Sequence, residues 1–271
     1  MKRKILLAFA VSCLAFSIFT GCSGSATSET ETETEYYADE DFMSDLAKGL
    51  EKRWSISNTV DSKTYLDADE FIEDRTGLIN AELECVGSYK DFKFEDSKLQ
   101  EYAIKYINCL NDSLATLDYY KSDINKYSTD WDKIYNERSK LIKTFYNDFG
   151  LTVQEEYAST LKDFLNNAST VERKEALEKE LEKMVENLTY ECIEDGGGWR
   201  HYRGLLENTT EYGFNSISLN INLLDENDVI VESTYGHVNN MEKGQKAYIE
   251  FGSDKEFTYV KTQIDWYEIK E

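Results

Sequence analysis

The sequence predicts an α+β protein, in which an antiparallel helical bundle is followed by a small antiparallel β-sandwich. Apolar residues recur every three or four positions from about residue 40 to residue 188, which is the period of one helix face. From residue 189 onward, apolar and polar residues alternate instead, as in half-buried strands. The chain contains no proline, so Gly, Asn, Asp and Ser have to mark the breaks between elements.

Helices are expected over residues 42–54, 71–83, 97–124, 129–149, 152–164 and 169–188. Capping boxes predict that three of them begin at Ser97, Thr152 and Ser169. Thr129 is the expected cap of another, which Gly150 ends in the left-handed conformation. Each helix is polar on its other face and the connections are short, so antiparallel packing into one bundle buries every stripe. The Glu- and Lys-rich tract over residues 172–183 is interpreted as a solvated helix face.

Strands are expected over residues 202–207, 216–223, 229–238, 247–251 and 260–266. The clearest alternation places Ile217, Leu219 and Ile221 between serine and asparagine residues. Turns are expected over residues 225–228 and 239–244, and Gly196 to Gly198 are interpreted as a hinge or linker between the two regions. Several short antiparallel strands in about 80 residues are typical of a small sandwich.

The N-terminus has the pattern of a secretory signal. Basic residues at positions 2–4 precede an apolar run over residues 5–19, which is shorter than the ~20 residues that a membrane-spanning helix needs. An uncleaved anchor helix is the alternative. The run ends in the letters IFTGC, which resemble the lipobox of bacterial lipoproteins, with Phe19 where Leu is usual. That resemblance implies cleavage between Gly21 and Cys22, and acyl chains such as palmitate on Cys22.

The domain organisation follows from these segments. Residues 1–21 form the expected signal peptide, and residues 22–39 the lipidated cysteine with a Ser/Thr/Glu tether that has little to bury and cannot offset the entropy of ordering. The helical bundle covers residues 40–188 and the β-sandwich residues 189–271. Two acyl chains on one residue give stable anchoring, so we expect the chain on the extracytoplasmic face of a bacterial membrane.

The charge of the chain excludes several classes of partner. The chain has 30 basic and 53 acidic residues and a formal net charge of −23. Such a chain is repelled by phosphate backbones, so nucleic-acid binding is not expected. Anionic headgroups repel it in the same way, and the covalent lipid therefore has to provide the membrane attachment.

The C-terminal region resembles a known family over residues 200–268. The FxLYD domain, a module of bacterial surface proteins and lipoproteins, is named for a motif that corresponds here to Ile221, Leu223, Leu224 and Asp225. Ile221 replaces the family's Phe, Leu224 replaces its Tyr, and Asp228 stands where a turn Gly is usual. Residues 204–208 and 241–245 resemble the flanking strand and turn. The resemblance implies an immunoglobulin-like sandwich without known catalytic residues.

No catalytic or metal-binding pattern is predicted. The two histidines, His201 and His237, are interpreted as half-buried strand residues, and there is no nucleophile or phosphate-binding motif. The loop after Asp225 lacks the ligand and glycine of a calcium loop, because Val229 and Ile230 occupy those positions. No cofactor is expected.

The cysteines of the mature chain are expected to be ordinary buried thiols. Cys85, Cys109 and Cys192 are odd in number, so at most one disulfide can form among them, and the sequence does not say which. Their spacing matches no zinc motif.

These observations predict a membrane-anchored lipoprotein that binds or scaffolds and is not an enzyme. Its partner is expected to be an envelope protein or a wall polymer. The alternative is an envelope hydrolase that uses paired carboxylates, which the many acidic residues leave open. A transporter's solute receptor is disfavoured, because such receptors alternate helices and strands whereas this sequence segregates them.

Overall fold

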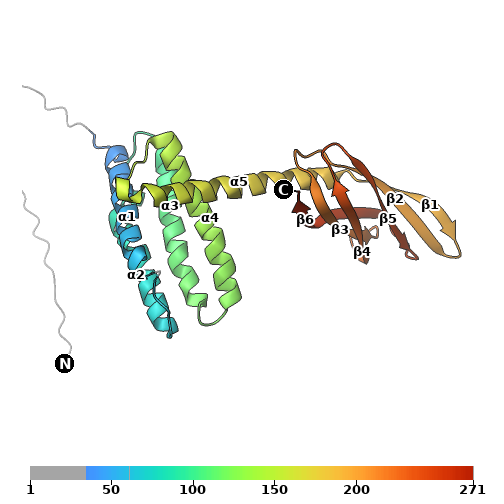
Figure 1. Cartoon of the computed structure of the whole chain (residues 1–271), viewed down its shortest axis with the longest axis horizontal. Coiled ribbons are helices and arrows are strands. Elements are labelled where there is room, and N and C mark those ends of the chain that lie inside the picture. Colours follow the sequence, from blue (N-terminus) through green and yellow to red (C-terminus); the bar gives the residue numbers. More distant parts are fainter. Residues whose placement is uncertain (1–34, 61, 271) are drawn as a thin grey trace, which may run out of the picture. The chain divides into compact units, whose positions relative to one another are not determined.

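The computed structural model describes residues 35–60 and 62–270. The expected signal peptide, its cleavage site at Gly21 and Cys22, and the tether up to residue 34 lie outside the described residues. The chain divides into two compact units, Met1–Tyr36 and Tyr37–Glu271, and the second unit contains every helix and strand described below (Figure 1).

The described residues confirm the α+β class, with helices first and strands after them. The helices are α1 (Asp39–Val60), α2 (Ala68–Val86), α3 (Ser97–Thr116), α4 (Ile124–Phe149) and α5 (Ala158–Glu186). The strands are β1 (Tyr190–Gly196), β2 (Trp199–Glu207), β3 (Phe214–Leu224), β4 (Ile230–Met241), β5 (Lys246–Ser253) and β6 (Tyr259–Ile269). They form two antiparallel sheets, in the orders β1-β2-β5 and β4-β3-β6.

The boundary between α3 and α4 differs from the prediction. The helix expected to reach Ile124 ends at Thr116, and Ile124 is instead the first residue of α4. Asp123 caps α4, because its carboxylate accepts a hydrogen bond from the Lys126 backbone N–H at 3.0 Å. The predicted cap, Thr129, lies inside the helix. A carboxylate is a strong N-cap that also favours the positive end of the helix dipole, so the earlier aspartate begins the helix.

The ends of α3 and α4 also show how local chemistry sets helix limits. Asp96, one residue before the predicted cap Ser97, accepts hydrogen bonds from the Lys98 and Leu99 backbone N–H groups at 2.8 and 3.2 Å. Gly150 ends α4 with φ of 71°, which confirms the predicted left-handed stop.

Helix α5 is continuous where the sequence predicts two helices. No helix begins at Ser169, whose hydroxyl donates to the Leu165 carbonyl at 2.8 Å, one turn back in the same helix. Thr170 does the same with Asn166 at 3.0 Å. A hydroxyl can bond within the helix as well as cap it, so a capping-box sequence without a preceding break does not end a helix.

Two apolar cores are present in the described residues. The first lies among α1 to α4 and the start of α5, with Phe42, Tyr106 and Phe145 among its largest fully buried side chains. The second contains residues from both sheets together with Leu177, Leu181 and Val185 of α5. The sequence assigns this last stripe to the helical bundle, but in the structure it packs against the strands.

The strand region confirms the central alternation and corrects its start. The inward residues of β3, among them Ile217, Leu219 and Ile221, are fully buried as predicted. Gly197 and Gly198, with φ of 67° and 86°, connect β1 to β2 as a hairpin turn, so the predicted linker is wrong. Strand β1 is exposed after its first residue, and its sequence therefore shows no burial period to detect.

The turn between β3 and β4 and the C-terminal end of β4 can also be compared with the prediction. The predicted turn over residues 225–228 is confirmed, and Asp228 adopts φ of 64° at the place where a glycine is usual in the resembled family. Strand β4 continues to Met241, three residues beyond the predicted Val238, because Asn239 and Met241 still pair with β3.

Candidate functional site

A charged cluster lies inside the helical core, and the sequence analysis does not predict it. Glu82 of α2 accepts hydrogen bonds from Arg53 of α1 at 2.9 Å and from Arg138 of α4 at 2.9 and 3.1 Å. The Tyr106 hydroxyl of α3 donates to the same carboxylate. Glu82 and Tyr106 are fully buried and Arg138 is 3% exposed, so the cluster ties four helices together out of reach of a substrate.

The electrostatics of this cluster fix its protonation. Burial alone raises the pKa of Glu82, but the charges of Arg138 and Arg53 and the Tyr106 hydroxyl lower that pKa more, so it lies below the usual value. Burial, followed by the negative charge of Glu82, raises the pKa of Tyr106 well above its usual value. At neutral pH the cluster therefore holds an ionised carboxylate and a protonated phenol, which brace the bundle.

The sequence did contain a signal for this cluster. Glu82 falls between Ile79 and Val86 on the buried stripe of α2, and Arg138 falls one turn before the buried Ile142 of α4. A charged residue at a stripe position is rarely buried without a partner. Two such residues of opposite charge on different helices would indicate an internal ion pair. The sequence does not indicate which acidic residue pairs with which basic one.

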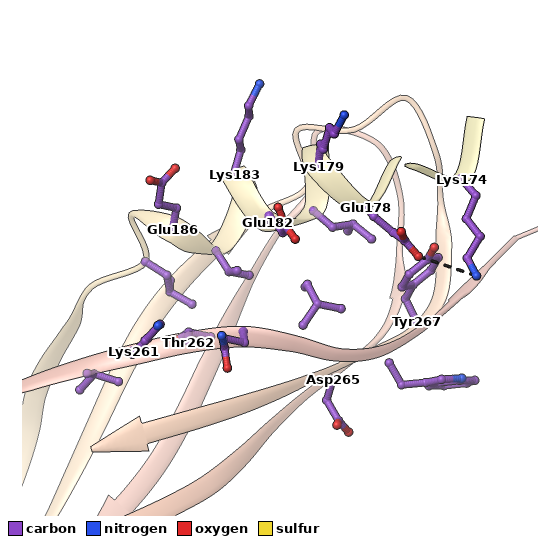
Figure 2. Close-up of a pocket in the computed structure, with 17 residues that line it drawn as sticks. Lys174, Glu178, Lys179, Glu182, Lys183, Glu186, Lys261, Thr262, Asp265 and Tyr267 are labelled. Atoms are coloured by element: carbon purple, nitrogen blue, oxygen red, sulfur yellow. Dashed lines mark ion pairs between the residues drawn. The ribbon is translucent and has the colours of Figure 1, made fainter. Parts of the chain in front are cut away.

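The open feature nearest to a binding site is a groove between α5 and β6. It has a volume of about 1190 Å³ and is lined by α5 between Lys174 and Glu186, by Leu188 just after that helix, and by residues 260–267 of β6 (Figure 2). Four lysines line it, Lys174, Lys179, Lys183 and Lys261, and four carboxylates, Glu178, Glu182, Glu186 and Asp265. The groove is thus neutral in formal charge, in a chain of net charge −23.

Side chains enter the groove from both walls. Figure 2 shows Tyr267 of β6 pointing toward Glu178 of α5, and Lys174 forms an ion pair with Glu178 at 3.8 Å. Partial burial, and then the negative charge of Glu178, raises the pKa of Tyr267, so its hydroxyl stays protonated at neutral pH. Asp265 points away from α5 in the same view.

The floor of the groove is apolar. Leu181 and Val185 of α5 also belong to the core of the strand region, and Val260 and Ile264 of β6 pack against that core. A neutral rim over an apolar floor is suited to binding, since ion pairs at the rim position a ligand while the floor contributes the hydrophobic term. The tract over residues 172–183, interpreted from sequence as a solvated face, supplies much of this rim.

The two histidines lie in different sheets and both are exposed, so the prediction that they are half-buried is wrong. His201 lies in β2 of one sheet and His237 in β4 of the other, where its Nε2 lies 2.8 Å from Asn239 Oδ1. Over residues 35–60 and 62–270, no group of three or more His, Cys, Asp and Glu side chains is placed to hold a metal ion.

The three thiols are all unpaired. Cys109 is buried as expected. Cys85 is only half-buried and Cys192 on β1 is exposed, so the prediction of buried thiols is wrong for Cys192 and only partly met by Cys85. Burial raises the pKa of Cys109 to about 12, so this thiol is not a nucleophile at neutral pH. The exposure of Cys192 could not be predicted from the sequence, because the residues of β1 show no alternation of buried and exposed positions.

The residues of the family motif lie at structural positions. Ile221 and Leu223 are fully buried in β3, and Leu224 is buried at the end of that strand. Asp225 follows them and accepts hydrogen bonds from the backbone N–H groups of Asn227 at 2.8 Å and Val229 at 3.0 Å. Three of these residues therefore fill the core, and the fourth stabilises the turn that leads into β4.

Comparisons with known proteins add little to this site. No protein-family model matches the chain, and no curated protein matches it. A solved structure, the Pseudomonas fluorescens alkylpurine DNA glycosylase AlkC bound to DNA containing an abasic site analog, aligns with 80% of this chain and 73% of its own. The identity is 8% and the TM-score 0.20, a likeness that supports no conclusion.

The structure also bears on membrane contact, for the part of the chain that it describes. None of the helices there combines the length and the apolar composition that crossing a bilayer demands.

Proposed function

We propose that this chain is a lipid-anchored binding protein of the extracytoplasmic face of a bacterial membrane, and that the groove between α5 and β6 is a recognition surface. The anchor is proposed from the sequence, in which the apolar run and the IFTGC motif place the lipid on Cys22. The binding role is supported chiefly by one observation, the open, charge-balanced groove with an apolar floor.

We further propose that the strand region is an immunoglobulin-like sandwich of the FxLYD kind. Two antiparallel three-stranded sheets that share one core are consistent with this fold. The buried Ile221 and Leu223, followed by the turn-forming Asp225, support the same assignment, because they give each residue of the motif a physical role.

The binding role is tested by capture of envelope components on the full chain, purified in detergent and immobilised. Lys183→Glu reverses one charge on the groove rim, and Lys162→Glu makes the same change at an exposed position of α5 outside the groove. We expect wild type and Lys162→Glu to retain the same envelope component and Lys183→Glu to lose most of it. Equal retention by all three chains would show that the groove is not the recognition surface. Turnover of polysaccharide or peptide substrates, with no component retained, would favour the hydrolase instead.

A further inference from the structure

The outward face of the sheet β4-β3-β6 carries an ordered set of uncharged side chains. Ile217, Leu219 and Ile221 of β3 point into the core, so the alternate residues point to the other face. The strand register aligns the outward residues into rows, and two central rows are Tyr235–Asn220–Gln263 and His237–Ser218–Trp266. None of these six residues carries a formal charge when histidine is counted as neutral, in a chain where 31% of residues are charged. The adjacent outward row, Ser233–Asn222–Lys261, adds one cation.

A β-bulge brings the tryptophan onto this face. Ser218 pairs with Trp266 and Leu219 pairs with Ile264, which leaves Asp265 as the extra residue of β6. The Ser218 hydroxyl lies 3.4 Å from Asp265 Oδ2, so Asp265 shares the outward side with Ser218. A bulge places two successive residues opposite one partner, and Trp266 is accordingly 53% exposed beside it.

A second large aromatic side chain, Tyr235, lies on β4, two strands away from Trp266 on β6. Tyr235 of β4 is 65% exposed, in the row next to that of Trp266. Their backbone positions are about 12 Å apart, since two strand spacings of ~4.8 Å combine with an offset of two residues, ~3.4 Å each, along β3. This distance is longer than one sugar ring, so two exposed rings on the sheet can contact different units of one extended chain.

The side chains between the aromatic rings are amides and hydroxyls. Gln263 offers both a donor and an acceptor. Asn220 is half-buried and offers its amide N–H groups, because its Oδ1 is buried without a hydrogen-bond partner among the described residues. Such groups pair with the hydroxyls of a sugar, while an aromatic ring packs against the C–H side of a pyranose. A protein partner is less suited to this face, because interface hot spots lie within packed apolar surroundings that these rows do not provide.

We propose that the outward face of β4-β3-β6 binds an extended, neutral polysaccharide, with Trp266 and Tyr235 as stacking platforms and Asn220 and Gln263 as hydrogen-bonding groups. The inference extends the proposed binding role by naming a class of partner. It is independent of the lipid anchor. Charge supports a neutral polymer over an anionic one, because the net charge of −23 repels polyanions and because Asp265 on this face offsets the single cation, Lys261.

The test measures binding of the full chain in detergent to soluble chitohexaose and cellohexaose by titration calorimetry, with polygalacturonate as the anionic probe. We expect a neutral hexasaccharide to bind and polygalacturonate not to bind. Trp266→Ala and Tyr235→Ala should each weaken binding by about tenfold, as expected for the loss of ~1.4 kcal/mol. The matched controls are Trp199→Ala and Tyr248→Ala, which remove exposed aromatic rings from the other sheet and should change affinity less than twofold.

The outcomes separate this inference from the broader binding role. Absence of binding to every neutral hexasaccharide by folded wild type would overturn it, as would equal losses in the variants and their controls. Capture of an envelope protein that Tyr235→Ala abolishes, without glycan binding, would show a protein interface on this face and would leave the general binding role intact, since Tyr235 lies outside the groove. Failure of both glycan binding and envelope capture would overturn both proposals.

Discussion

At the scale of single residues, the most consequential feature is the buried carboxylate of Glu82. Three donors from three other helices converge on it, and each would be left with an unpaired polar group if the carboxylate were removed. Buried ion pairs do not by themselves add much stability relative to apolar packing, but they are costly to break. We therefore interpret Glu82 as a residue that specifies which helices pack together.

Replacing Glu82 by Gln should destabilise the fold strongly. The variant keeps the shape of the side chain but leaves Arg53 and Arg138 as buried cations without a counter-ion, which should lower the free energy of unfolding by about 3–5 kcal/mol. Urea unfolding followed by circular dichroism measures the loss. Glu84→Gln is the matched control on the same helix as Glu82. It breaks an exposed pair between Glu84 and Lys52 of α1 and should cause little change. Similar effects of the two variants would show that the cluster does not brace the bundle.

The stability difference between wild type and Glu82→Gln should depend on pH. The pKa of Glu82 in the folded chain lies below the usual value of 4.5, so its contribution to stability is complete above that value and is lost as the pH falls through the lower folded pKa. The difference in unfolding free energy between wild type and Glu82→Gln should be constant above pH 5.5 and shrink below pH 4.5. A difference that grows on acidification would contradict the assigned direction of the pKa.

At the scale of elements, sequence periodicity predicts the helices and strands that bury one face. It does not predict elements that are exposed on both faces, nor where a helix begins. The alternation in β3 is confirmed, because Ile217, Leu219 and Ile221 face one core. Strand β1 has no such face, and its sequence has no period to detect. The length of α5 was also missed, since a hydroxyl residue such as Ser169 can cap a helix or bond within it, and local sequence does not decide between these states.

The approach of the two sheets gives a prediction at this scale. A Cβ atom at Gly236 of β4 would lie 2.6 Å from Ile249 Cγ2 in β5 of the other sheet and 3.2 Å from Ile221 Cδ1 in β3. Gly236→Ala should therefore overpack the core and lower the unfolding free energy by about 1–3 kcal/mol.

Gly77 in the interior of α2 provides the matched control. A Cβ atom there has no neighbour within 4 Å, so Gly77→Ala should raise stability by about 0.5–1 kcal/mol through helix propensity. Thermal unfolding of both variants measures the two effects. A neutral Gly236→Ala would mean that the sheets lie farther apart than described.

At the scale of the whole molecule, the order of helices before strands could be predicted from the sequence. Which helix packs against the strands could not. The stripe of Leu177, Leu181 and Val185 has the same helical period as any bundle stripe. Nothing in that period shows that its partners are strands, because an amphipathic helix encodes the width of its apolar face and not the identity of what covers it. The candidate groove was missed for the same reason, as its two walls come from α5 and β6.

The candidate binding face illustrates how much of a site sequence can contain. The polar residues Ser218 and Asn220 are predicted to face outward from β3 by alternation alone. Their neighbours Tyr235 and Trp266 follow only from the register of β4 and β6, and the bulge at Asp265 changes which side Trp266 occupies. Register depends on turn geometry and on pairing across the sheet, which the sequence of one strand does not contain.

The central claim is that the chain works outside the cell while held by lipid on Cys22, and intact-mass spectrometry of the membrane-extracted protein tests it most directly. The account predicts a mature chain that begins at Cys22 and carries the added mass of acyl chains, and a Cys22→Ala variant without that mass that is no longer retained by the membrane. A wild-type chain that begins at Met1 and bears no acyl group would contradict both the anchor and the location on which the proposed function depends.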